Sequence, residues 1–161
     1  MWRIRQANIN DLDELVQLRI DLMREVGSLK EGVDEAALET ATRRYFVEKL
    51  PKGGFLAWVA EADGRVVGIS GLILFDRPPT ADNLSGLEGY VLNMYTMPEW
   101  RGKGIGTALL NEIIKFAKTT DARRLRLHAT PAGRPVYEKA LFIPLSATRS
   151  SSALTAMELA W

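Results

Sequence analysis

Residues 101–107 read Arg101-Gly102-Lys103-Gly104-Ile105-Gly106-Thr107, a glycine-rich turn on which the fold prediction depends. The turn follows a predicted strand, Glu88–Thr96, and leads into a predicted helix, Ile105–Thr119, whose apolar residues recur at helical spacing. Glycine allows a turn so tight that several backbone N–H groups point toward one place. These groups and the helix dipole together favour phosphate oxygens. The sequence therefore predicts a phosphate site here, with Arg101 and Lys103 adding positive charge.

Two common phosphate motifs do not fit this turn. A Walker A loop requires G-x-x-x-x-G-K-[ST], and no Lys-Ser or Lys-Thr pair occurs here. A dinucleotide fingerprint requires G-x-G-x-x-G, but its third glycine falls on Thr107 when counted from Gly102 and on Leu109 when counted from Gly104. A glycine-rich connection without any ligand remains the alternative.

The remaining elements predict a mixed α/β chain. Asp63-Gly64 is a strong hairpin signal between two apolar runs, and the helix at 105–119 is a crossover between two strands that we expect to be parallel. We expect one domain, residues 1–161, and a Ser/Thr-rich loop over 146–153. The predicted strands are Trp2–Gln6, Phe55–Glu61, Val66–Phe75, Glu88–Thr96, Leu125–Ala129, Leu141–Ile143 and Leu154–Trp161. Four helices are predicted. The first has Asn10 or Asp11 as its N-cap and ends at Gly27, and the others span Asp34–Lys49, Ile105–Thr119 and Arg134–Lys139. In the second helix, Ala37, Ala41 and Tyr45 are spaced to lie on one stripe.

Composition excludes several classes of site. The chain has no cysteine, which excludes disulfides and thiol nucleophiles, and its single histidine, His128, argues against a metal centre. The formal net charge is +1, so no overall field favours nucleic acid or a membrane surface. The first residues lack the apolar core of a signal peptide, and no run is long enough to span a membrane. We therefore expect a cytoplasmic protein without a metal.

The turn and its surroundings resemble one known family. The chain reads Met94-Tyr95-Thr96-Met97-Pro98-Glu99-Trp100 immediately before the turn, and Arg101, Gly104 and Gly106 match the pattern [QR]-x-x-G-x-[GA]. This looks like the acetyl-CoA signature of the GCN5-related N-acetyltransferase (GNAT) family, whose later strand, loop and helix correspond to residues 127–142. Leu141 stands where that family usually has glycine. The resemblance implies a mixed, mostly antiparallel sheet of about six or seven strands, flanked by about four helices, with a splayed parallel pair.

The same resemblance implies where acetyl-CoA binds. The pantetheine arm would pair with main-chain groups of Met94, Tyr95 and Thr96, like an added strand. An N–H near Met94 or Tyr95 would face the thioester oxygen. The pyrophosphate would lie on the backbone amides of the turn, which are those of Arg101, Gly102, Lys103, Gly104, Ile105, Gly106 and Thr107.

Transfer to an amine requires two proton movements, because the amine loses a proton and the CoA thiolate gains one. Tyr137 matches the family's tyrosine and is the candidate general acid; the alternative is an aromatic residue that closes the domain with its hydroxyl bonded elsewhere. Glu88 is the candidate base, because it shares strand parity with Met94 and Thr96; the alternative is a solvated carboxylate. The family's glutamate aligns nearer Tyr90. Asn93 lies within an apolar strand and needs a partner in the backbone or the substrate.

The predicted function is transfer of acetyl from acetyl-CoA to a primary amine of a small molecule or peptide, by direct attack in a ternary complex. The absence of cysteine favours that route over an acyl-enzyme. The alternative is a regulatory or interaction module that binds CoA without turnover. A homodimer through the final strand, which ends at Trp161, is compatible with the sequence.

Overall fold

The computed structural model describes residues 1–145 and 154–161, so the predicted loop at 146–153 lies outside the described residues. The helices are α1 (Leu12–Glu25), α2 (Glu35–Lys49), α3 (Ile105–Ala117) and α4 (Arg134–Lys139), with 3-10 turns at Ile9–Asp11 and Pro98–Trp100. The strands are β1 (Trp2–Gln6), β2 (Leu56–Ala62), β3 (Arg65–Asp76), β4 (Leu87–Thr96), β5 (Arg124–Ala129), β6 (Ile143–Pro144) and β7 (Thr155–Ala160).

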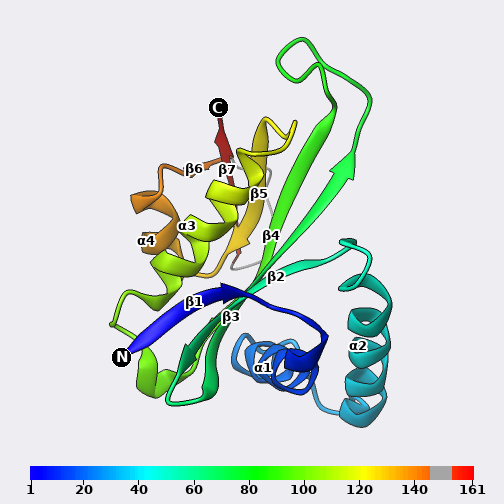
Figure 1. The fold of residues 1–161 in the computed structure, drawn as a ribbon, viewed down its shortest axis with the longest axis vertical. Coiled ribbons are helices and arrows are strands. Elements are labelled where there is room, and N and C mark those ends of the chain that lie inside the picture. The colour runs from blue at the N-terminus through cyan, green and yellow to red at the C-terminus, as the bar shows by residue number, and fades with distance from the viewer. Residues whose placement is uncertain (146–153) are drawn as a thin grey trace.

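In the described part of the chain, seven strands form one sheet in the order β1-β2-β3-β4-β5-β7-β6 (Figure 1). Strands β4 and β5 run parallel, with α3 as the crossover between them, and every other pair is antiparallel. The hairpin of β2 and β3 turns at Asp63 and Gly64, which both have positive φ, as a type I′ turn requires. The predicted fold class, the hairpin and the parallel pair are confirmed.

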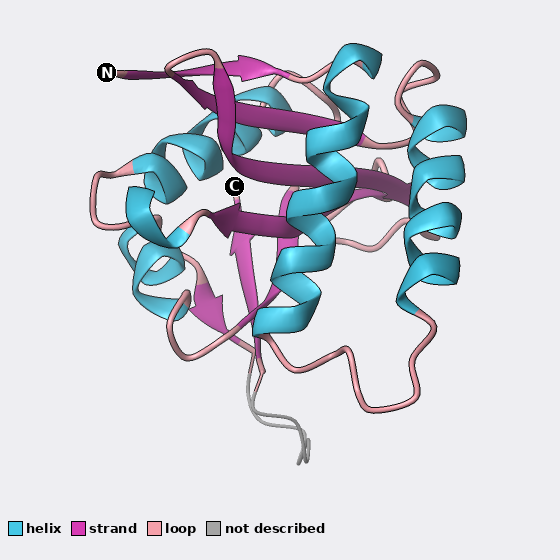
Figure 2. Cartoon of the chain, turned by 90° about the horizontal axis from the view of Figure 1, so that it is seen from below, coloured by secondary structure: helices cyan, strands magenta, loops and turns pink. Residues whose placement is uncertain are grey.

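Helices cover both faces of the sheet (Figure 2). One face packs against α3, where Ile105, Leu109 and Ile113 are fully buried because they recur on one side of that helix. The other face packs against α1 and α2, through a core that includes Leu15, Phe46 and smaller groups from β2 and β3. The two cores are separated by the central strands, so each residue of β4 faces one of them.

The helices agree with the predictions in one detail and differ in another. Asp11 is the N-cap residue of α1, which is one of the two predicted positions, although its side chain makes no capping bond to α1. It accepts a hydrogen bond from the Asn8 amide, and Asn8 caps the preceding 3-10 turn by accepting one from the Asn10 amide. In α2 the buried residues are Thr42 and Phe46, and the predicted stripe of Ala37, Ala41 and Tyr45 is exposed. That prediction was wrong because Phe46, one position further on, packs against Phe55 and sets which side of α2 faces the sheet.

No helix within the described residues is long and apolar enough to cross a membrane. The same residues contain no group of three or more histidines or acidic residues that could hold a metal ion.

Candidate active site

The turn after β4 has free backbone donors. Gly102 and Gly104 have φ of 74° and 81°, a conformation that favours glycine, and α3 begins directly afterwards at Ile105. Among the described residues, no amide from Gly102 to Thr107 has a hydrogen-bond acceptor, and the ladder of α3 starts with the Ala108 amide bonding the Gly104 carbonyl. A Cβ added to Gly106 would meet no atom within 4 Å. The turn thus offers successive N–H groups to open space, as a diphosphate requires.

The two cations of the turn are held differently. The Arg101 guanidinium donates to Glu25 of α1 at 2.6 Å and to the Thr96 carbonyl at 2.9 Å, and the bond to Glu25 raises the pKa of Arg101. Its charge is therefore already balanced by a carboxylate. The Lys103 ammonium lies 4.3 Å from the centre of the Trp100 ring and within the same turn.

Strands β4 and β5 separate soon after they meet. Their pairing is limited to Gly89 with Leu125 and Tyr90 with Arg126, although β4 continues to Thr96. On its other side β4 remains paired with β3 as far as Thr96. Backbone groups of β4 that face β5 beyond Tyr90 are consequently available to an extended ligand. This segment includes Met94, Tyr95 and Thr96, although the Thr96 carbonyl already accepts from Arg101.

A bulge at Asn93 changes which residues of β4 share a face. Asn93 has φ of 55°, and the register with β3 shifts between Ile69 and Gly71. Leu92 packs with the α1–α2 core whereas Met94 packs with the α3 core, which a regular strand would not allow. The prediction that Glu88 shares a face with Met94 and Thr96 is therefore wrong, because one inserted residue reverses the alternation.

Glu88 lies within a cluster of arginines. Its carboxylate is 3.5 Å from Arg77, 3.6 Å from Arg124 and 3.5 Å from Arg126, and its side chain is only 7% exposed. Arg124 and Arg126 also contact Glu158 of β7. The arrangement ties β4, β5 and β7 together at the end where β4 and β5 still pair. The sequence signal for this network was the alternation of Arg124 and Arg126 on β5.

Tyr137 of α4 has a buried ring and an unbonded hydroxyl. The residue is 7% exposed and packs edge-to-face on Phe142, with ring centres 6.0 Å apart. Its hydroxyl has no hydrogen-bond partner among the residues that the structure describes. Burial, and to a lesser extent the charge of Tyr90, raises the pKa of Tyr137 to about 12. The phenol therefore keeps its proton at neutral pH and is able to donate it to a ligand.

Leu141 adopts the backbone of the glycine that it replaces. Its φ is 68°, and α4 ends in two bonds, from the Phe142 amide to the Tyr137 carbonyl and from the Leu141 amide to the Glu138 carbonyl. The turn after Tyr137 is consequently preserved, with a left-handed leucine that is 76% exposed.

A second titratable pair lies where β4 and β5 part. The Tyr90 hydroxyl is 2.6 Å from Nδ1 of the exposed His128, and burial raises the pKa of Tyr90. Tyr90 is close enough to Tyr137 for its charge to affect that phenol. Hence Tyr90 and His128 join β4 to β5 at the start of the opening between the strands.

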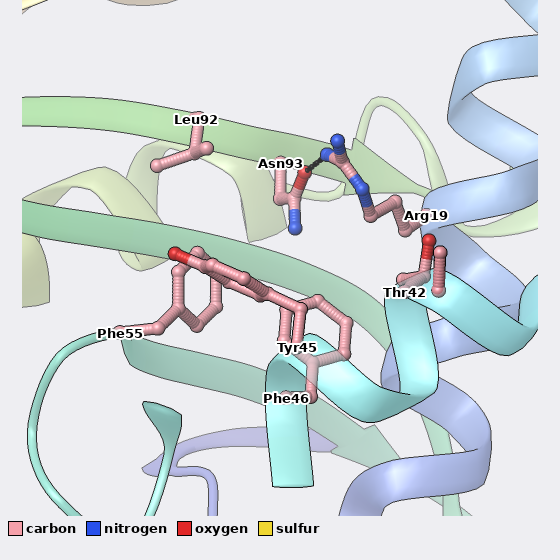
Figure 3. A pocket seen from close by; sticks show the side chains of 8 residues that line it. Arg19, Thr42, Tyr45, Phe46, Phe55, Leu92 and Asn93 are labelled. Carbon is pink, nitrogen blue, oxygen red and sulfur yellow. Dashed lines mark hydrogen bonds between the residues drawn. The ribbon is translucent and has the colours of Figure 1, made fainter. Parts of the chain in front are cut away.

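A cavity of about 350 Å³ lies between α1, α2 and β4 (Figure 3). Its polar groups are Arg19, Thr42 and Asn93, and aromatic rings form much of the rest. The Arg19 guanidinium donates to Oδ1 of Asn93, which is the contact drawn in Figure 3. The sequence prediction did not include Arg19. The sequence could have identified Arg19 by its position. It lies four residues after Leu15 and three after Val16, and this spacing places its charge on the buried side of α1.

Known proteins resemble this chain in sequence and in fold. Residues 14–141 match the model of the acetyltransferase (GNAT) family. The chain is 31% identical to a predicted acetyltransferase from Clostridium acetobutylicum whose crystal structure contains acetyl-CoA; the match covers 94% of this chain and 96% of that one, with a TM-score of 0.83.

Two curated relatives are acetyltransferases as well. An uncharacterised N-acetyltransferase of Archaeoglobus fulgidus is 26% identical, over 71% of this chain and 72% of that protein. An N-alpha-acetyltransferase of Sulfurisphaera tokodaii is 29% identical, over 73% of this chain and 63% of that protein. The family match spans most of the chain, and it includes the turn, the splayed strands and Tyr137. The chain therefore belongs to the GNAT family, and it is an acyl-CoA N-acyltransferase that uses a CoA thioester.

Proposed function

We propose that residues 1–161 form one domain that transfers an acetyl group from acetyl-CoA to the primary amine of a small molecule or peptide, by direct attack in a ternary complex. The observation that carries this proposal is the buried phenol of Tyr137, whose raised pKa keeps it protonated and whose hydroxyl has no hydrogen-bond partner among the described residues. The run of free amides from Gly102 to Thr107 supports the binding of the cosubstrate's diphosphate.

The proposed placement of acetyl-CoA follows from the free backbone groups. The diphosphate lies on the amides of Gly102 to Thr107, with Lys103 adding charge, and Arg101 mainly fixes the turn against α1. The pantetheine arm pairs with β4 between Met94 and Thr96. The bulge at Asn93 turns a backbone N–H near Met94 toward the thioester oxygen, which stabilises the oxyanion formed on attack.

In the proposed reaction the amine nitrogen attacks the thioester carbon, a C–N bond forms and the C–S bond breaks. Tyr137 donates a hydrogen bond to the departing sulfur and assists its protonation. The proton from the amine passes to the Tyr90–His128 pair, whose hydroxyl and ring nitrogen are 2.6 Å apart where β4 and β5 part. We assign Glu88 to holding the three arginines rather than to this proton transfer.

Release of free thiol tests the proposal. Purified protein is incubated with acetyl-CoA and panels of polyamines, aminoglycosides, amino acids and peptides, and each product is identified by mass. We expect at least one amine class to be acetylated, and Tyr137→Phe to reduce its turnover. No acetylation in any panel, with no thermal shift by acetyl-CoA, overturns the proposal; stabilisation by CoA without Tyr137-dependent thiol release identifies a CoA-binding module instead.

The cytoplasmic location stays a prediction, and so does a homodimer. The final strand, β7, is paired on both sides, with β5 and with β6.

A further inference from the structure

The cavity between α1, α2 and β4 contains a cation that has no counter-ion within residues 1–145 and 154–161. Arg19 is half-buried, and burial lowers its pKa. Its only hydrogen bond within the described residues goes to the neutral amide of Asn93, and it forms no ion pair with a carboxylate there. By contrast, Arg24 on the same helix contacts Asp21 and Glu35, and Arg43 on α2 contacts Asp13. A half-buried guanidinium without an acid is costly unless a ligand supplies one.

The rest of the cavity is apolar and aromatic. Tyr45, Phe46 and Phe55 form one wall, with ring centres 5.0 to 5.9 Å apart (Figure 3). Leu92 of β4 lies across from these rings. The volume of about 350 Å³ is at the lower end of the range for small-molecule sites. The site therefore suits a small ligand with an apolar body and one anionic group.

The cavity lies against the strand segment that we assign to the thioester. Leu92 and Asn93 line it, and the next residue, Met94, belongs to the stretch proposed to hold the pantetheine arm. Asn93 thus has two roles, since it forms the bulge and orients Arg19 by accepting its hydrogen bond. A ligand in the cavity has one end at Arg19 and passes the bulge where the acetyl carbon would lie.

We propose that this cavity binds the acceptor and selects amines that also carry a carboxylate and an apolar body, with the carboxylate on the Arg19 guanidinium. The proposal rests on the acetyltransferase function proposed above. A guanidinium has a planar array of donors that matches a carboxylate with two parallel hydrogen bonds, and Asn93 occupies only part of that array. Free amino acids and the ends of short peptides both present this chemistry, and the kinetic comparison below separates them.

Binding is tested without turnover, using a ligand that has no amine. Calorimetry compares hydrocinnamate with hydrocinnamide on the protein saturated with CoA. We expect the acid to bind about ten- to a hundredfold more tightly, because hydrogen bonds to charged groups are the stronger ones. Arg19→Met removes that preference. Arg19→Lys retains only part of it, since an ammonium lacks the planar pair of N–H donors with which a guanidinium binds a carboxylate. The matched control is Arg44→Met, which removes an exposed arginine of α2 outside the cavity and leaves the preference intact.

A second variant keeps the test valid if Arg19→Met does not fold. Asn93→Asp places a carboxylate beside Arg19, and aspartate also tolerates positive φ. We expect this variant to fold with an unchanged melting temperature and to lose its preference for hydrocinnamate, because Arg19 then has an internal counter-ion. Equal binding of acid and amide by the parent protein, or a preference that survives both Arg19→Met and Asn93→Asp, overturns the proposal.

Kinetics connect the anion site to the acceptor. We expect kcat/KM to be about tenfold or more higher for phenylalanine than for phenylalaninamide, and this ratio to fall to about one in Arg19→Met. A dipeptide and its C-terminal amide form the second pair of substrates. The pair with the larger ratio of kcat/KM, acid over amide, shows whether the carboxylate comes from a free amino acid or from a peptide end. Arg19-dependent binding of hydrocinnamate without acetylation of any amine contradicts the proposed function alone. Acetylation of amines with no advantage for the carboxylate contradicts the present proposal alone.

Discussion

The hydroxyl of Tyr90 lies 2.6 Å from Nδ1 of His128, and this contact joins β4 to β5 where their backbone pairing ends. Neither residue is part of the phosphate turn, and the two are 38 positions apart in the chain. The charge of Tyr90 also contributes to the raised pKa of Tyr137 on α4. The contact therefore lies at the start of the opening between the two strands, where we propose that the thioester binds.

Removal of the Tyr90–His128 contact tests its role in proton transfer. We expect Tyr90→Phe and His128→Gln each to lower kcat about tenfold or more, because a general base typically contributes a factor of that order or larger. The KM for acetyl-CoA should stay within about twofold, since neither side chain belongs to the turn. Measurement of kcat against pH is decisive, because loss of a base changes the acidic limb of the profile, whereas a packing defect lowers the profile without changing its shape.

Tyr137 is expected to control departure of the thiolate. Tyr137→Phe should lower kcat by about a hundredfold and leave the Kd of acetyl-CoA almost unchanged. The raised pKa of about 12 also predicts that ultraviolet titration of tyrosinate loses its most alkaline step in this variant. The folded protein holds this proton more tightly than the unfolded chain does, so the stability of the parent falls as pH rises from about 10 to about 12. A tyrosine that titrates at its ordinary value would contradict the burial of this phenol.

Gly106 tests the diphosphate site. A side chain there meets no protein atom, so Gly106→Val should change the free energy of unfolding by less than about 1 kcal/mol. The same side chain fills the space beside the free amides, and we expect the Kd of CoA to rise about tenfold or more. Calorimetry and thermal melting measure the two effects. Tight CoA binding by this variant would place the diphosphate elsewhere, and Gly106→Ala serves as the smaller, matched change.

The Glu88→Gln variant tests whether Glu88 has a structural role or a catalytic one. Glu88→Gln leaves three arginines without their shared carboxylate, so we expect the free energy of unfolding to fall by about 1–3 kcal/mol. At a temperature where the variant is fully folded, kcat should remain within about threefold of the parent value. Denaturant unfolding and thiol release give the two numbers. A large loss of kcat at unchanged stability would restore Glu88 as the base.

Replacement of Leu141 by glycine is expected to stabilise the folded protein. A left-handed leucine costs about 1–2 kcal/mol relative to glycine, and the greater freedom of unfolded glycine returns about 0.5–1 kcal/mol of that. We expect Leu141→Gly to raise the free energy of unfolding by about 0.5–1 kcal/mol, because the exposed leucine side chain contributes little burial. Leu141→Ala keeps the left-handed strain and is the control. Equal stability of the two variants would show that the backbone here carries no strain.

Local signals in the chain were sufficient for much of the fold. The hairpin at Asp63-Gly64, the helix after the glycine turn and the strands on either side were predicted correctly, because each depends on neighbouring residues. Tyr137 and the turn were found in the same way, through a motif that is continuous in sequence. Their proposed roles still await the experiments above.

The sequence by itself determined the glycine-rich turn, the parallel pair around α3 and the family, since glycine positions and hydrophobic spacing are local properties. Only the tertiary structure decided which charges have partners. The bulge at Asn93 arises from pairing with β3. It reverses the alternation of β4 side chains, on which the prediction that Glu88 shares a face with Met94 depended. Arg19 and Asn93 are 74 positions apart, and their contact depends on how α1 packs against β4. Charge balance is a property of such packing, so no spacing rule could show that Arg19 has no acidic partner in the described part of the chain.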